Sequence, residues 1–120
     1  MSQKAQILLN IDALRGYLKA DIINQPVSAG SNILSEGIKP THSPALLRIY
    51  ASFDAQGVLK IAREKGGESV TEDLNSGNAL TANCAYMFDI LATRDEEVNL
   101  QYSVDATCLR LIVVELPVLW

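Results

Sequence analysis

The sequence has few of the side chains that usually carry out chemistry. It holds one histidine and two cysteines, Cys84 and Cys108, in 120 residues. Two separated cysteines are too few for a disulfide framework, and with one histidine they form no zinc-ligand set. Both lie in apolar strand patterns, where a free cysteine packs as a small hydrophobic side chain; a bridge between neighbouring strands is the alternative. We therefore expect no metal site and no cofactor.

Clusters of basic charge and long apolar runs are also missing. The 10 lysines and arginines stand singly along the chain, and with 14 acidic residues they leave a net charge of −4. A nucleic-acid partner is not expected, because phosphate binding needs a concentrated basic surface. No apolar stretch approaches the roughly 18 residues that span a bilayer, and MSQKAQILLNIDALRG has no signal-peptide core. We expect a soluble protein with no membrane partner, either cytoplasmic or virion-associated.

What is present is an apolar pattern with a period of two. The chain is 48% hydrophobic and 20% charged, which suits one domain with one core. Alternation runs through residues 45–53, 58–65, 68–74, 84–93 and 98–104, separated by the turn signals DAQG, KGG, NSGN and RDEE. Such spacing predicts a hairpin-linked, all-β fold: a single antiparallel β-sandwich over residues 1–120, jelly-roll-like, with about eight strands. DAQG is expected to close a turn with Gly57 at positive φ.

Two segments differ from simple alternation. In ESVTEDL, Glu68 and Glu72 share the parity of Val70, which predicts an edge strand. TCLRLIVVEL is apolar on both faces, which indicates a central strand or one covered by a neighbouring subunit.

The first 44 residues are ambiguous. Ile7, Ile11, Leu14 and Leu18 recur at helical spacing, yet Gly16 interrupts them and no capping residue precedes them. DIINQPVS and SNILSEGI resemble short strands, the first at an edge because it contains a proline. GIKPTHSP is a loop. We favour strands with an extended arm or extra strand at residues 1–19 over an N-terminal helix, which remains the alternative.

No residue pattern indicates catalysis. His42 lies in a proline-rich loop, and no G-x-S-x-G motif supplies a nucleophile for it. The acidic groups near Glu68–Asp73 could serve a hydrolase or calcium, but solvated turns and edge charges explain them, and no EF-hand loop is present. The sequence predicts no catalytic residue and no enzyme. Tyr50 and His42 are candidate contacts for a small ligand or glycan, so a carbohydrate-binding module is the alternative function.

The C-terminus is the most suggestive feature. Residues 117–120 form an apolar tail that ends in Trp120. Such a tail either packs on its own sheet or docks on another subunit, and exposed apolar ends usually need a cover. We predict a homo-oligomer. The predicted interface residues are Ile112, Val114, Leu116, Val118, Leu119 and Trp120.

Three segments carry a resemblance: VLKIAREKGGESVTEDLN, LTANCAYMFDILATRDEEVNLQYSV and TCLRLIVVEL. Over about residues 45–116 the chain resembles the small β-sandwich modules of virion proteins from tailed phages and archaeal viruses, and of prophage-like islands. The resemblance implies a structural or decoration role and supplies no functional motif. The leading hypothesis is a non-enzymatic, self-associating β-sandwich with a structural or interaction role.

Overall fold

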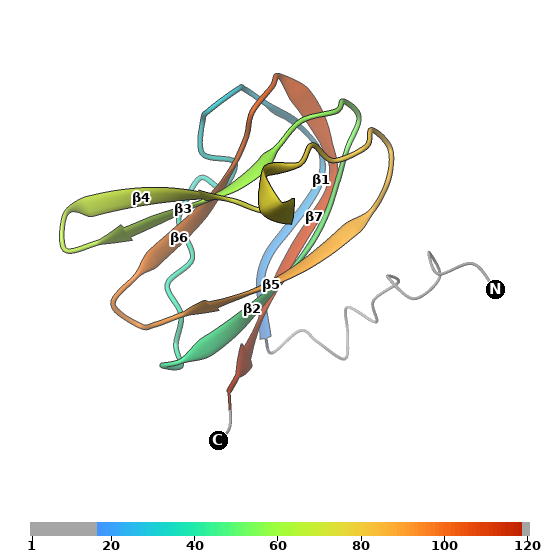
Figure 1. The fold of residues 1–120 in the computed structure, drawn as a ribbon. Helices are drawn as coiled ribbons and strands as arrows, with labels where there is room; N and C mark the ends of the chain where they lie inside the picture. The colour runs from blue at the N-terminus through green and yellow to red at the C-terminus, as the bar shows by residue number, and fades with distance from the viewer. Residues whose placement is uncertain (1–16, 119–120) are drawn as a thin grey trace.

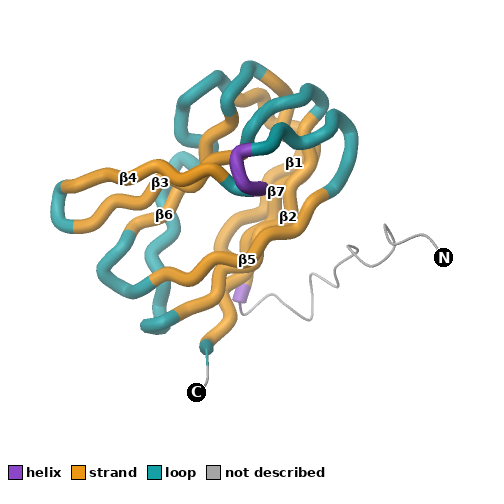
Figure 2. The backbone as a smooth tube through the Cα atoms, in the orientation of Figure 1, coloured by secondary structure: helices purple, strands orange, loops and turns teal. Residues whose placement is uncertain are grey.

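The computed structural model describes residues 17–118, which form two antiparallel β-sheets (Figures 1 and 2). One sheet has four strands in the order β1-β7-β2-β5, and the other has three in the order β4-β3-β6. A short 3-10 turn, Asn75–Gly77, lies between β4 and β5. The strands are β1 (Leu18–Val27), β2 (Ala45–Phe53), β3 (Leu59–Lys65), β4 (Glu68–Asp73), β5 (Tyr86–Ala92), β6 (Glu97–Tyr102) and β7 (Ala106–Pro117).

The all-β sandwich predicted from alternation is confirmed, with seven described strands instead of the expected eight. The difference lies in SNILSEGI, which makes only isolated bridges to β6, Asn32 with Gln101 and Ile38 with Val98. Between those bridges the Asn99 side chain accepts a hydrogen bond from the Leu34 N–H at 3.0 Å and donates one to the Leu34 C=O at 2.9 Å. The Ile33 N–H still donates to the Leu100 C=O at 2.8 Å, but the side-chain amide interrupts the backbone ladder at Leu34, so no continuous strand forms there.

The hairpin predicted at DAQG, between residues 45–53 and 58–65, is not formed. β2 pairs with β7 and β5, whereas β3 pairs with β4 and β6, so the chain crosses between sheets at DAQG. Gly57 does not have the positive φ expected of it; instead, a Cβ there would lie 2.9 Å from the Tyr102 ring. The β3–β4 hairpin is tight as predicted, with Gly66 and Gly67 at φ 61° and 85°.

The core fills the space between the two sheets, and alternate residues of β2, β3 and β6 are buried in it. Phe53 and Tyr102 stack across it with ring centroids 3.8 Å apart, and the Tyr102 hydroxyl donates to the Ala55 C=O at 2.7 Å. This pair joins the four-stranded sheet to the three-stranded one. Core residues at most 1% exposed include Leu47, Ile49, Phe53, Leu59, Ile61, Val98, Leu100, Tyr102, Leu111 and Val113.

The positions predicted for three strands are also confirmed. β4 is the edge of its sheet, and all its residues are exposed. β7 is central, between β1 and β2, and β1 is an edge strand that contains Pro26. Leu18 begins β1 and therefore continues no helix. Of the arm or extra strand predicted at residues 1–19, Leu18 and Lys19 belong to β1, whereas residues 1–16, like Leu119 and Trp120, lie outside the described residues.

Candidate interaction surface

The side of the four-stranded sheet turned away from the core, here called the outer face, is largely apolar. Side chains alternate between faces along a strand, and the register brings the outward ones of β1, β7, β2 and β5 into rows. Ile23 is 62% exposed, Leu91 51% and Met87 48%. The apolar members of the outer face are Leu18, Ile23, Leu46, Tyr50, Met87, Leu91, Ile112, Val114 and Leu116.

The charges of the outer face neutralise one another within the chain. Arg48 donates to both carboxylate oxygens of Asp89, at 2.8 and 2.9 Å, from β2 to β5. Arg110 lies 3.0 Å from Asp21, from β7 to β1. Each pair leaves no net charge, although the chain as a whole carries −4. Two copies of this face would therefore not repel each other.

The outer face is buried at its centre and exposed toward its edges. Tyr50, Ile112 and Val114 are at most 9% exposed, whereas Ile23 on β1 and Met87 and Leu91 on β5 are about half or more exposed. Exposed apolar groups of this kind often mark a binding surface. The outer face is therefore a candidate interaction surface.

The predicted interface residues fall in or near the outer face. Ile112 and Val114 are buried there, packed with Tyr50 and Leu18. Leu116 is half-buried and pairs with Leu46, and Val118 is half-buried just beyond β7. Their predicted contact with a second subunit remains a prediction.

A buried carboxylate lies on the opposite side of β7. Glu115 is 2% exposed and pairs with the core residue Leu47, so its side chain points inward. It accepts hydrogen bonds from the Thr41 N–H at 3.0 and 2.9 Å, from the Thr41 hydroxyl at 2.8 Å and from the His42 N–H at 2.9 Å. His42 Nδ1 also contacts it, and Lys19 Nζ lies 3.3 Å away.

The Glu115 cluster stabilises the charged carboxylate. Burial alone would raise the pKa of Glu115, but the donors from Thr41, His42 and Lys19 outweigh it and lower the pKa from 4.5 to about 2. The carboxylate thereby fastens the loop before β2, and the start of β1, to the end of β7. Sequence reasoning missed this role, although a lone inward-facing glutamate in LIVVELP was a usable signal.

The two candidate ligand contacts do not form one site. His42 joins Glu115 on the inner side of the sheet, whereas Tyr50 pairs with Ile112 on the outer face. Tyr50 is only 9% exposed and packs on Val114, which leaves little ring surface for a sugar. Contact of Tyr50 or His42 with a ligand remains a prediction.

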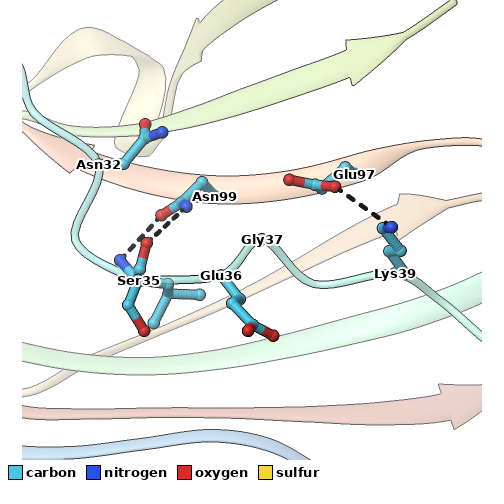
Figure 3. A pocket seen from close by; sticks show the side chains of 8 residues that line it. Asn32, Ser35, Glu36, Gly37, Lys39, Glu97 and Asn99 are labelled. Carbon is cyan, nitrogen blue, oxygen red and sulfur yellow. Dashed lines mark hydrogen bonds and ion pairs between the residues drawn. The ribbon is translucent and has the colours of Figure 1, made fainter.

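A polar groove of about 860 Å³ lies between residues 32–39 and β6 (Figure 3). The side chains that line the groove mainly form hydrogen bonds and ion pairs within the chain. Asn99 holds the backbone of Leu34, and Lys39 Nζ lies 3.8 Å from Glu97 (Figure 3). Asn32 accepts a hydrogen bond from Gln101 at 2.8 Å. We interpret the groove as the join between this segment and β6.

Within residues 17–118, no three histidine, cysteine, aspartate or glutamate side chains gather as metal ligands. Cys84 and Cys108 are both unpaired thiols. None of the described residues belongs to a helix with the length and apolarity needed to cross a membrane. The chain matches no protein-family model, and comparisons with curated proteins and solved structures found no match.

Proposed function

We propose that this protein is a non-enzymatic, self-associating β-sandwich, with a structural or interaction role, and that its outer face is the contact between copies. The observation that carries the proposal is the apolar outer face with its internally paired charges, Arg48 with Asp89 and Arg110 with Asp21. Sheets pack face to face at about 10 Å when their facing side chains are apolar. The virion-type role rests on the resemblance alone.

A second copy fits this face better than an unrelated partner of strong charge. A two-fold contact brings the same surface together twice, so the surface must be complementary to itself. The outer face meets this condition because each arginine already has its acidic partner. Tyr50, Ile112 and Val114 are already buried within the chain, and a standard interface buries about 800 Å² of accessible surface per partner, so contacts beyond the flat face are expected to contribute.

The test replaces one exposed apolar residue on each sheet. Ile23→Lys puts a charge on the outer face, and Val70→Lys makes the same kind of change on β4, at similar exposure (62% and 57%). We expect Ile23→Lys to weaken self-association about tenfold, because the contact must then bury an ammonium group. Val70→Lys should leave the association unchanged. Sedimentation velocity over a concentration series measures both.

Two results would contradict the proposal. A wild-type protein that remains a 13.1-kDa monomer at all concentrations would remove self-association altogether. Equal effects of the two lysine substitutions would show that the outer face is not the contact.

A further inference from the structure

The free edges of the two sheets differ in how well they are protected. A free strand edge can pair with another chain, and proteins normally blunt it with charge, proline, bulges or a covering segment. On the three-stranded sheet, residues 32–38 bridge to the free side of β6. Among the described strands this leaves β1, β4 and β5 with an uncovered side.

Two of these edges carry protective features. β1 has a register irregularity between Leu18 and Ala20, Asn24 at φ 49°, and Pro26, which has no N–H. β4 exposes three acidic residues; Glu72 and Asp73 are paired with Arg63 and Lys60 of β3, and Glu68 adds a charge that would oppose pairing with the same strand of another copy. Neither edge is suited to self-pairing.

β5 has none of these features. Its sequence, YMFDILA, has no proline, glycine or lysine, and its register with β2 is continuous. Its one charged residue, Asp89, is already bound by Arg48. The core-facing side chains of Tyr86, Phe88 and Ile90 are only half-buried, although they pack on the main core. An added strand would complete their burial.

We infer that β5 pairs antiparallel with β5 of a second copy, so that two four-stranded sheets become one eight-stranded sheet. This contact adds to the proposed self-association and uses a different surface from the outer face, so either can fail without the other. The partner is a second copy because the half-buried side chains of Tyr86, Phe88 and Ile90 can bury one another, and a two-fold axis perpendicular to the sheet pairs identical strands antiparallel.

The charges and the ends of β5 select one register. In an antiparallel pair of strands, directly opposed residues face the same side of the sheet. A two-fold axis that relates two copies of β5 must therefore pass at a residue and not between two residues. An axis at Asp89 would oppose it to Asp89 of the partner subunit, which is unfavourable. With the axis at Ile90, the pairing would extend past Leu91 and would need its C=O group. That group already accepts a hydrogen bond from Arg63 at 2.7 Å. An axis at Met87 would pair fewer residues of the strand.

An axis at Phe88 avoids these difficulties. It opposes Phe88 to Phe88 of the partner subunit, an aromatic pair on the core side. Tyr86 then faces Ile90 of the partner subunit, and Met87 faces Asp89 of the partner subunit. Cross-strand pairs of aromatic and β-branched residues are among the favourable ones.

The register can be tested with opposite charges at one position. Met87 is exposed, so lysine and aspartate should both be tolerated there, and both remove the same apolar side chain from the outer face. Met87→Asp places like charges opposite each other twice per dimer, whereas Met87→Lys places opposite charges there. We expect dimerisation to be about tenfold weaker in Met87→Asp than in Met87→Lys. Equal dimerisation of the two variants would overturn the inference.

Cysteine crosslinking provides an independent test in a Cys84→Ser background. Cys108 can stay, because burial raises the pKa of its thiol to about 12 and it is fully buried. Directly opposed residues lie within disulfide range, so Phe88→Cys should give a covalent dimer on mild oxidation. Met87→Cys and Asp89→Cys should crosslink much less. Preferred crosslinking at 87 or 89 would overturn the register. Oligomers without any crosslink would overturn the edge contact and leave the outer-face contact standing.

Discussion

Replacing Glu115 by glutamine tests the buried carboxylate that fastens the loop before β2 to β7. The variant keeps the size of the side chain and removes its charge. Donors from Thr41, His42 and Lys19 surround the carboxylate, and hydrogen bonds to a charged group contribute about 1.5–3 kcal/mol each when one partner is lost. At pH 7 we expect Glu115→Gln to lower the free energy of unfolding by about 3 kcal/mol.

The dependence on pH gives a sharper signature. The folded-state pKa of Glu115 is about 2, against an ordinary value of 4.5. The unfolded chain therefore binds a proton at this group first as pH falls, so the stability is fully present above about pH 5 and is lost toward pH 2. A shift of this size corresponds to about 3 kcal/mol. The wild type and the variant should therefore converge in stability at low pH.

Urea unfolding followed by circular dichroism at pH 7, 5, 4 and 3, at fixed protein concentration, measures the difference. Other carboxylates titrate equally in both proteins, so their contributions cancel in the difference between the two unfolding free energies. Glu72→Gln is the control, because Glu72 pairs with Arg63 at 2.6 Å but its side chain is 51% exposed; such a surface pair contributes about 0–1 kcal/mol. A constant difference between wild type and Glu115→Gln across this range of pH would refute the reasoning.

Other substitutions probe the joins between segments by the same unfolding measurement. Asn99→Ala should cost about 2–3 kcal/mol, because the buried N–H and C=O of Leu34 lose both their partners; an unchanged midpoint would contradict this. Gly57→Ala should cost about 1–3 kcal/mol, because its Cβ would lie 2.9 Å from the Tyr102 ring. Tyr102→Phe should cost about 1 kcal/mol through its bond to the Ala55 C=O, and a loss as large as that for Asn99→Ala would contradict this assignment.

The sequence predicted which way side chains point better than it predicted which strands pair. Alternation is a local signal, so the inward parity of residues such as Leu47 and Val98 could be read directly. Pairing at DAQG depends on distant residues. The Asp54 N–H donates to the Thr107 C=O at 3.1 Å, and Asp54 Oδ1 accepts from the Thr107 N–H at 2.7 Å. Asp54 thus joins the start of β7 and closes no hairpin.

The same limit applies to the candidate surface. Ile112, Val114 and Leu116 could be placed on a second apolar face because β7 is apolar on both sides. The donors to Glu115 come from Thr41 and His42, 74 and 73 residues away in sequence, so no local pattern indicates them. Likewise, the missing protection of β5 is evident only once the strand order is known.

The two proposed contacts together predict a definite assembly. The axis of the β5 contact is perpendicular to the sheet, whereas the axis of the outer-face contact lies parallel to it. Two perpendicular two-fold axes that intersect generate a closed tetramer of four chains; axes that do not meet generate an open array. In the closed case, two eight-stranded sheets would pack through their outer faces.

Single variants separate these cases by native mass. We expect a tetramer of 13.1-kDa chains for the wild type. Ile23→Lys and Met87→Lys both put a charge on the outer face and leave the β5 contact, so each should give a dimer. Met87→Asp charges the outer face and also opposes Asp89 of the partner subunit, so it should give a monomer. If Met87→Asp gives the same dimer as Met87→Lys, β5 does not supply a contact. If mass rises without limit as the wild-type concentration increases, the axes do not intersect and the assembly is open.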